Sequence, residues 1–308
     1  MALASISVDL DSLPQYCRIH GLDEGMLDLR AQRLVYQLAI PRYLELFDSS
    51  GVKATFFAVG EDLRDEDNAR SLRRARAAGS EIANHSLSHD YALSRRPRSE
   101  IDAELAGAEE AIHAAVGERP VGFRAPGYAL SAELYRALAE RHYAYDSSTF
   151  PAAPYYAAKA AVMAASRALG RRSRAILDTP RALLAPRTPY HPDPSRPYAR
   201  GSGSVLELPI TTAPFARIPF IGTFAAALPE APVRATYLTL RSVPHFNFEL
   251  HGIDVLEVGD GIPPALAAYQ RDLRVTAHTK LSRLRSVLRW IRQDFEVVTL
   301  SEAARRLG

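Results

Sequence analysis

Two short segments combine histidines and carboxylates at spacings that could hold a metal ion. His85 and His89 stand four residues apart, which would place both imidazoles on one side of a helical turn and let them bind one divalent ion. Asp9 and Asp11 flank Leu10 at the carboxyl end of an alternating stretch that is typical of a strand. Two histidines and one carboxylate make a three-ligand shell with open positions, as in catalytic metal sites, and a second carboxylate could act as a base.

Two later segments could contribute further residues to the same metal site. Residues 122–128 read Gly-Phe-Arg-Ala-Pro-Gly-Tyr and place Arg124 after a predicted strand, ahead of a turn that exposes backbone N–H groups. Residues 246–251 read Phe-Asn-Phe-Glu-Leu-His and deliver His251 at the end of another predicted strand. Taken singly, each segment suits an ordinary turn or a packed histidine as well as it suits a site.

The elements that must position these residues alternate between strand and helix through the first ~150 residues. The patterns predict strands at 4–10, 53–59, 81–84, 121–123 and 143–146, and helices at 34–49, 69–78, 99–116 and 131–141. Further strands are predicted at 205–209, 246–251 and 296–300, with a helix around 280–293. Parallel βαβ units bring the carboxyl ends of their strands to one side, where sites form. We therefore expect a single α/β barrel-like domain over residues 1–308.

This alternation breaks at Pro151, where we predict an insertion covering about 151–204. Eight of the 21 prolines lie between 151 and 200. The segment from Lys159 to Arg200 contains nine Lys or Arg but only two acidic residues. An Ala-rich helix is expected over 155–169, followed by a basic stretch. One side of the helix would carry Tyr155, Tyr156, Val162, Met163 and Leu169, and the basic stretch is Arg171, Arg172 and Arg174.

Two interpretations of this basic, Pro-rich insertion stay open. In the first it is a lid or packing element with a solvated basic end. In the second, residues 155–200 dock on an anionic membrane surface or on the phosphate of a lipid-linked sugar.

The composition limits the class of protein. The chain is 47% hydrophobic and 24% charged with a net charge of only +3, which gives no chain-wide field for nucleic acid. Cys17 is the sole cysteine, so a metal must be bound by histidines and carboxylates. Asp9 interrupts any secretory h-region, and no stretch reaches the ~18 apolar residues of a membrane span. We expect a cytoplasmic protein, peripheral at the inner membrane face if the basic segment binds lipid.

In order and spacing, all of these segments resemble the polysaccharide deacetylases, carbohydrate esterase family 4. The stretches Lys-Ala-Thr-Phe-Phe-Ala-Val-Gly at 53–60 and Gly-Ser-Glu-Ile-Ala-Asn-His-Ser-Leu-Ser-His-Asp at 79–90 are typical of that family. The resemblance covers roughly residues 4–150 and 205–308. It implies a distorted (β/α)7-type barrel that hydrolyses N-acetyl groups.

The resemblance also implies a role for each motif residue. Asp11, His85 and His89 match the metal ligands of the family, and Asp9 matches its general base. Arg124 matches the residue that positions this base.

Four more positions follow from the same resemblance. His251 matches the general acid, and Asp146 matches the carboxylate that tunes this acid. The backbone N–H near Tyr128 is a candidate oxyanion donor, and Phe150 would form part of the apolar wall around the acyl methyl. The chain departs from the commoner family pattern at three places: Leu10 separates the two aspartates, Phe150 replaces a tryptophan, and Gly127-Tyr128 reverses the usual order.

The function implied is removal of an N-acetyl group from an amino sugar of a polysaccharide, oligosaccharide or lipid-linked glycan. Asp9 would take a proton from a metal-activated water, and His251 would protonate the leaving amine. We expect one divalent ion, Zn²⁺ first, since Co²⁺, Ni²⁺ and Mn²⁺ suit the same ligands. Two alternatives remain open, namely removal of formyl or another small acyl group from a lipid-linked amino sugar, and a non-catalytic carbohydrate-binding protein.

Overall fold

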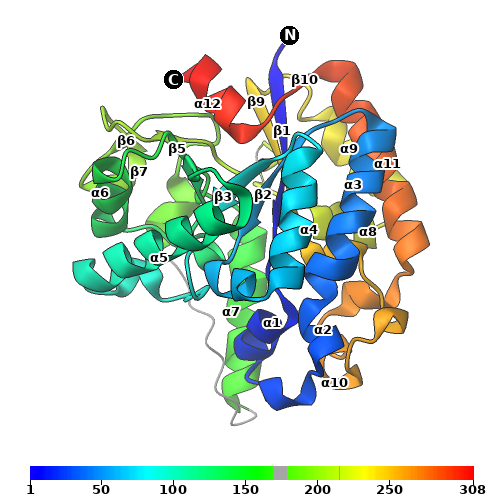
Figure 1. The fold of residues 1–308 in the computed structure, drawn as a ribbon. Helices are drawn as coiled ribbons and strands as arrows, with labels where there is room; N and C mark the ends of the chain where they lie inside the picture. Colours follow the sequence, from blue (N-terminus) through cyan, green and yellow to red (C-terminus); the bar gives the residue numbers. More distant parts are fainter. Residues whose placement is uncertain (169–178, 215) are drawn as a thin grey trace.

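The computed structural model describes residues 1–168, 179–214 and 216–308, and a curled parallel sheet forms its centre (Figure 1). The described strands are β1 (Leu3–Asp9), β2 (Ala54–Ala58), β3 (Glu81–Asn84), β4 (Gly122–Phe123), β5 (Tyr145–Asp146), β8 (Leu206–Glu207), β9 (His245–His251) and β10 (Glu296–Val297). They pair in the order β9-β1-β2-β3-β4-β5-β8, and β10 pairs with the start of β1. Beyond β8, the N–H of Thr211 donates to the carbonyl of Asn247 (3.1 Å), which draws the two ends of the sheet together. The predicted distorted (β/α)7-type barrel is confirmed.

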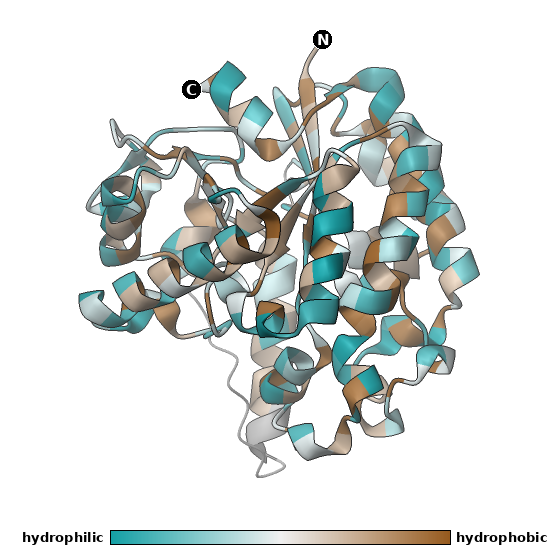
Figure 2. Cartoon of the chain, in the orientation of Figure 1, coloured by the Kyte–Doolittle hydropathy of each residue, from teal (hydrophilic) through white to brown (hydrophobic). Residues whose placement is uncertain are grey.

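Helices cover the outside of this sheet. They are α1 (Leu13–His20), α2 (Leu29–Leu34), α3 (Ile40–Ser50), α4 (Glu66–Ala77), α5 (Arg98–Val116), α6 (Ala132–Glu140), α7 (Ala153–Ala168), α8 (Gly222–Ala227), α9 (Glu230–Leu238), α10 (Pro264–Ala267), α11 (Ala277–Asp294) and α12 (Leu300–Leu307). Their outer faces are hydrophilic and their inner faces pack on apolar strands (Figure 2). The predicted helix at 34–49 proves to be the end of a longer one, since α2 continues through a π-helical stretch, Val35–Ala39, into α3.

The strand predicted at 296–300 is shorter in the structure. The observed strand, β10, ends at Val297, and the Thr299 side chain accepts from the N–H of Glu302. Threonine is a favourable N-cap because its oxygen satisfies a backbone donor that the first helical turn leaves open. Leu300 therefore begins helix α12.

The polar side chains of β1 face the barrel interior. Ser5, Ser7 and Asp9 alternate with apolar residues, yet all seven residues of the strand are buried. Ser5 Oγ lies 3.0 Å from His245 Nε2, and Ser7 Oγ donates to Asn247 Oδ1 at 3.3 Å across the β1–β9 pair. The alternation in β1 thus reflects a polar barrel interior and not an exposed face. The candidate site lies at the carboxyl end of this strand.

The described residues between β5 and β8 lie outside the main sheet, in which these two strands are direct neighbours. They form α7 and a small antiparallel hairpin of β6 (Pro192–Asp193) and β7 (Arg196–Arg200). Helix α7 lies at the carboxyl end of the parallel strands (Figure 1). The expected basic stretch at 171–174, like Leu169, lies outside the described residues. Within the described part of the chain, no helix combines the length and the apolarity needed to cross a membrane.

Candidate active site

A cavity of about 330 Å³ opens at the carboxyl ends of the strands. Its lining brings together residues from β1, the loops after β3 and β4, the end of β9, and helices α1 and α7. These residues include Asp9, Asp11, His85, Tyr128, Tyr155 and His251. The predicted motifs, spread over more than 240 residues of sequence, therefore meet at one place.

Asp11, His85 and His89 form a compact cluster of possible ligands. One ligand atom from each lies within 4.8 Å of the other two, and all three residues are buried. Asp11 Oδ1 lies 3.2 Å from His85 Nε2 and 3.1 Å from His89 Nε2. Two ligand atoms bound about 2.0–2.2 Å from one tetrahedral Zn²⁺ are separated by about 3.4 Å. The cluster is thus near the spacing that one ion requires.

The hydrogen bonding of this cluster also fits a metal ion. His85 Nδ1 lies 2.7 Å from the carbonyl oxygen of Arg124, so an Nδ1–H donor there leaves the lone pair of Nε2 directed at Asp11. Asp11 Oδ1 and both ring nitrogens of His89 are buried and make no hydrogen bond to the described residues. Buried polar atoms normally have partners. A divalent cation would bind Asp11 and one ring nitrogen of each histidine.

The loop that carries the two histidines is not the helical turn expected from their spacing. Ser86 and His89 adopt positive φ angles of 66° and 57°, which no regular helix contains. Side chains hold this turn instead: Asn84 Oδ1 accepts from the N–H of Ser86 (2.7 Å), and Ser86 Oγ accepts from the N–H of His89 (3.0 Å). The histidines converge because of these caps rather than through helical periodicity.

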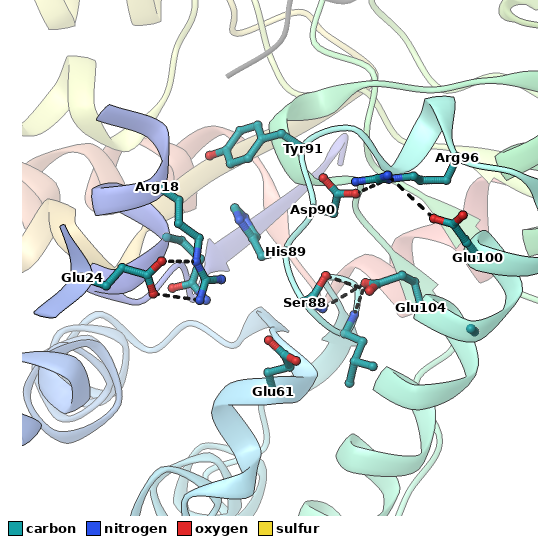
Figure 3. A pocket seen from close by; sticks show the side chains of 13 residues that line it. Arg18, Glu24, Glu61, Ser88, His89, Asp90, Tyr91, Arg96, Glu100 and Glu104 are labelled. Carbon is teal, nitrogen blue, oxygen red and sulfur yellow. Dashed lines mark hydrogen bonds and ion pairs between the residues drawn. The ribbon is translucent and has the colours of Figure 1, made fainter. Parts of the chain in front are cut away.

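Glu104, on helix α5, supports the same loop from behind (Figure 3). Its carboxylate accepts from the N–H groups of Leu87 (3.1 Å) and Ser88 (2.9 Å) and from Ser88 Oγ (2.7 Å). These residues line a second, acid-rich cavity of about 630 Å³ on the far side of His89. Sequence reasoning missed Glu104, because a glutamate on an amphipathic helix is normally exposed and its sequence position does not indicate such a contact.

Asp9 is held by a buried arginine. Arg124 Nη1 donates to Asp9 Oδ1 at 2.5 Å, and Arg124 Nη2 donates to Ser7 Oγ and Ser147 Oγ, both at 2.9 Å. The guanidinium lies over the Phe57 ring, 4.2 Å from its centroid, and is fully buried. A planar cation with this many fixed partners leaves Asp9 one orientation. The structure places Arg124 beside Asp9, where the resemblance put it.

His251 lies beside Asp9 at the cavity, in a network with Glu249 and Tyr128. Its Nδ1 is 3.0 Å from Glu249 Oε1, and its Nε2 is 3.1 Å from the Tyr128 hydroxyl, which itself donates to Glu249 (2.7 Å). Burial opposes the charged imidazole, but the negative charges of Glu249, Asp11 and Asp9 outweigh it and raise the pKa of His251 to about 9. The imidazole is therefore protonated at neutral pH and can donate a proton.

The structure differs from the prediction for Asp146. This carboxyl group lies at the end of β5, where it accepts from Ser148 Oγ (2.5 Å) and neighbours Glu207 on β8. Burial raises the pKa of Asp146 to about 6 and that of Glu207 well above its usual value. The carboxylate beside His251 is that of Glu249. It stands two residues before His251 on the same face of β9, a spacing that the sequence did display.

Tyr128 and Phe150 also occupy positions other than those expected. The N–H of Tyr128 donates to the carbonyl of Ala125 (3.0 Å), so it is already engaged in a turn, and the residue reaches the cavity through its ring and hydroxyl. Phe150 is fully buried behind it, with ring centroids 5.0 Å from both Tyr128 and Tyr155. Tyr128 and Tyr155 are among the described residues that line the cavity, and Phe150 is not.

Comparisons with known proteins agree with this architecture. Residues 32–145 match the family model for polysaccharide deacetylase. A peptidoglycan deacetylase from Helicobacter pylori is 26% identical over 156 residues, or 50% of this chain and 52% of that protein. The chain thus spans about half the length of this curated relative. The matched family segment includes His85, His89 and Arg124, whereas Asp9, Asp11 and His251 lie outside it.

A candidate polysaccharide deacetylase from Mycobacterium smegmatis shares the fold. It superposes with a TM-score of 0.63 over 99% of this chain and 89% of that chain, at 19% sequence identity. The likeness therefore extends beyond the family segment to the strands that carry Asp9, Asp11 and His251. The resemblance predicted from the motifs is confirmed, since residues 32–145 match the polysaccharide deacetylase family model and the Mycobacterium smegmatis protein shares the fold.

Proposed function

We propose that this protein is a metal-dependent hydrolase that removes the N-acetyl group from an amino sugar of a polysaccharide or oligosaccharide. The observation that carries the proposal is that Asp11 and His85, which cluster with His89, line one cavity together with Asp9 and His251. A cluster with unsatisfied ligand atoms stands near a fixed carboxylate and a protonated imidazole. Metal-dependent amide hydrolysis uses these three components.

Asp11, His85 and His89 would hold the ion, for which Zn²⁺ is the first candidate. When bound, a divalent ion of this kind lowers the pKa of water and polarises the acyl carbonyl. Asp9, fixed by Arg124, would accept the proton of the attacking water. His251 would donate its Nε2 proton to the departing nitrogen, because an amine leaves far more readily than its anion.

The walls of the cavity suit a sugar. Tyr16, Tyr91, Tyr128 and Tyr155 contribute aromatic surface with polar tips, a combination that packs against the apolar face of a sugar ring while its hydroxyls are hydrogen-bonded. The peptidoglycan named for the Helicobacter relative contains amino sugars, so the same class of N-acylated glycan is the first substrate to test.

An amine-release assay would test this function. Metal-free protein, reloaded with Zn²⁺ or Co²⁺, would be offered N-acetylated amino-sugar oligosaccharides of increasing length, with the N-formyl versions in parallel. We expect metal-dependent release from the N-acetyl series that a chelator stops and metal restores. Faster release from the N-formyl series would favour a deformylase. Metal-loaded protein that binds the oligosaccharides but releases no amine would show a binding protein instead.

A further inference from the structure

A separate cavity of about 420 Å³ lies between the carboxyl-terminal ends of helices α3 and α11, which run side by side (Figure 1). Strand β2 begins shortly after α3, and β10 begins shortly after α11. Both helices therefore end at the amino ends of the strands. The candidate active site, in contrast, is at the carboxyl ends of the strands.

The described residues that line this cavity offer hydrogen-bond donors and no carboxylate. They are Ser49 and Ser50 of α3 and Arg285, Arg289, Arg292 and Gln293 of α11. Arg289 and Arg292 follow Arg285 by four and seven residues, a spacing that brings all three to one side of an α-helix. We call this cavity the arginine pocket.

Two guanidinium groups of the arginine pocket have no acidic partner in the described part of the chain. Arg285 and Arg289 are both exposed, and neither forms an ion pair with a described carboxylate. Asp294, the acidic residue of α11, is bound by Arg241 at 2.7 Å. Asp48 of α3 is not among the lining residues. The pocket thus holds two positive charges that make no ion pair within the described fold.

The end of α3 holds Arg292 in the pocket. Its Nη1 donates at 2.5 Å to the carbonyl of Ser50, one of the carbonyls that the last turn of a helix leaves open. Gly51 ends α3 with a φ of 60°, and a Cβ there would stand 3.1 Å from this Nη1. A glycine at this position gives the guanidinium room for its bond. The arginine is therefore oriented before any ligand arrives.

Ser50 gives a second, independent indication of a ligand. The residue is 8% exposed, and its hydroxyl is buried and has no hydrogen-bond partner among the described residues. Ser49 differs, because its hydroxyl donates to the carbonyl of Leu46 at 3.1 Å. Buried polar atoms normally have partners, so a ligand oxygen in the pocket would complete the hydrogen bonding of Ser50.

We propose that the arginine pocket is a binding site for a phosphate ester. Guanidinium groups are planar and present paired donors that match the oxygens of a phosphate. The three arginines would bind the phosphate from α11, and Ser50 would donate to it from α3. The group that is recognised is the phosphate itself, which a soluble ester and a phospholipid headgroup share. The inference does not depend on the proposed hydrolysis, since the two cavities have no described lining residue in common.

Calorimetric titration with inorganic phosphate at low ionic strength tests the site. We expect wild type to bind one equivalent, and the affinity of the double variant Arg285→Gln/Arg289→Gln to be weaker by about tenfold or more, because two charged donors are lost. The matched control is Arg70→Gln/Arg74→Gln, which removes two exposed arginines at the same spacing on α4 and should change the affinity less than about twofold. Thermal unfolding of all three proteins checks that the variants are folded.

Co-sedimentation with phosphatidylcholine vesicles, with and without phosphatidic acid, distinguishes the two sources of the phosphate. Binding to the phosphatidic acid vesicles that Arg285→Gln/Arg289→Gln loses would identify a lipid headgroup as the ligand. Arginine-dependent binding of inorganic phosphate without such vesicle binding would identify a soluble ester. Equal binding of both probes by wild type and the double variant, or binding of neither probe by wild type, would overturn the proposal and leave the proposed hydrolase unaffected.

Discussion

Two clusters built from the same residue types reach the cavity, one through Asp11 and His85 and the other through Asp9 and His251, and they differ in what their polar atoms bind. Asp11, His85 and His89 form one, and Asp9, Glu249 and His251 form the other, each with ligand atoms within 4.8 Å of one another. In the first, Asp11 Oδ1 and both His89 nitrogens lack hydrogen-bond partners among the described residues. In the second, Arg124 contacts Asp9 and Tyr128 contacts both other members, and among the described residues only Glu249 Oε2 of this cluster is a buried atom without a hydrogen-bond partner.

This difference shows that residue type alone does not make a metal site. Ligands need free lone pairs, and the first cluster keeps them on Asp11 Oδ1 and on both nitrogens of His89. In the second cluster the Arg124 guanidinium bonds one oxygen of Asp9 and the Tyr128 phenol contacts Glu249 and His251, so this cluster is suited to moving protons. We therefore assign the ion to the first cluster and the acid–base chemistry to the second. Variants in the two clusters should fail in different ways.

The largest expected effect comes from removing a ligand. His85→Ala deletes one of three donors to the ion, so metal content should fall to background, and amine release should fall by about a thousandfold or more. Metal analysis beside the rate measurement checks both. His113→Ala, at an exposed position of α5, is the matched control and should behave as wild type. Full metal content in His85→Ala would contradict the assignment.

A loss of activity without loss of metal is expected at Asp9. Asp9→Asn keeps the shape of the side chain and a carbonyl oxygen for Arg124, but it removes the base. Turnover should fall by about 10²–10⁴-fold while metal content stays at the wild-type level. Activity near wild type with metal in place would exclude Asp9 as the base.

A shift in pH dependence is expected at Glu249. Among the negative charges that raise the pKa of His251 to about 9, that of the Glu249 carboxylate has the largest effect, so the imidazole of wild type stays protonated up to about that pH. Glu249→Gln should lower this pKa toward ~6.5 or below. Release at pH 8 would then drop by about 10- to 30-fold, with little change at pH 6.

Asp146→Asn is the matched control for that experiment, because the sequence pointed to Asp146 and the structure points to Glu249. The full pH profile of each variant should be recorded from pH 5 to 10. If Asp146→Asn lost activity at alkaline pH while Glu249→Gln kept the wild-type profile, Asp146 would be the carboxylate that tunes His251, as the sequence predicted.

The smallest effect, a modest loss of zinc affinity, is expected at Glu104, which supports the loop that carries His85 and His89. Glu104→Ala removes the acceptor for three donors of the histidine loop, so His89 should be held less firmly. Affinity for Zn²⁺ should weaken by about tenfold, as is usual for residues that orient ligands, while the rate at saturating metal changes little. Competition with a chelator of known affinity measures this. Unchanged zinc affinity would mean that the loop holds its shape without Glu104.

The sequence predicted the barrel well, because buried parallel strands and capped helices leave strong local patterns. It also identified the residues that meet in the cavity, since their motifs stand at strand ends. It could not predict contacts that depend on tertiary geometry, such as Glu104 under the histidine loop or the bond that engages the Tyr128 N–H. Glu249 is an intermediate case. Its place two residues before His251 was visible, but only the β9 register shows which carboxylate faces the imidazole.

Calorimetric titration of metal-free protein with Zn²⁺ tests the division between the clusters most directly, if wild type, Asp11→Asn and Asp9→Asn are titrated side by side without substrate. We predict one tightly bound equivalent in wild type and in Asp9→Asn, and at least about a hundredfold weaker binding in Asp11→Asn. Equal affinity in all three proteins, or loss of binding in Asp9→Asn with retention in Asp11→Asn, would contradict the account.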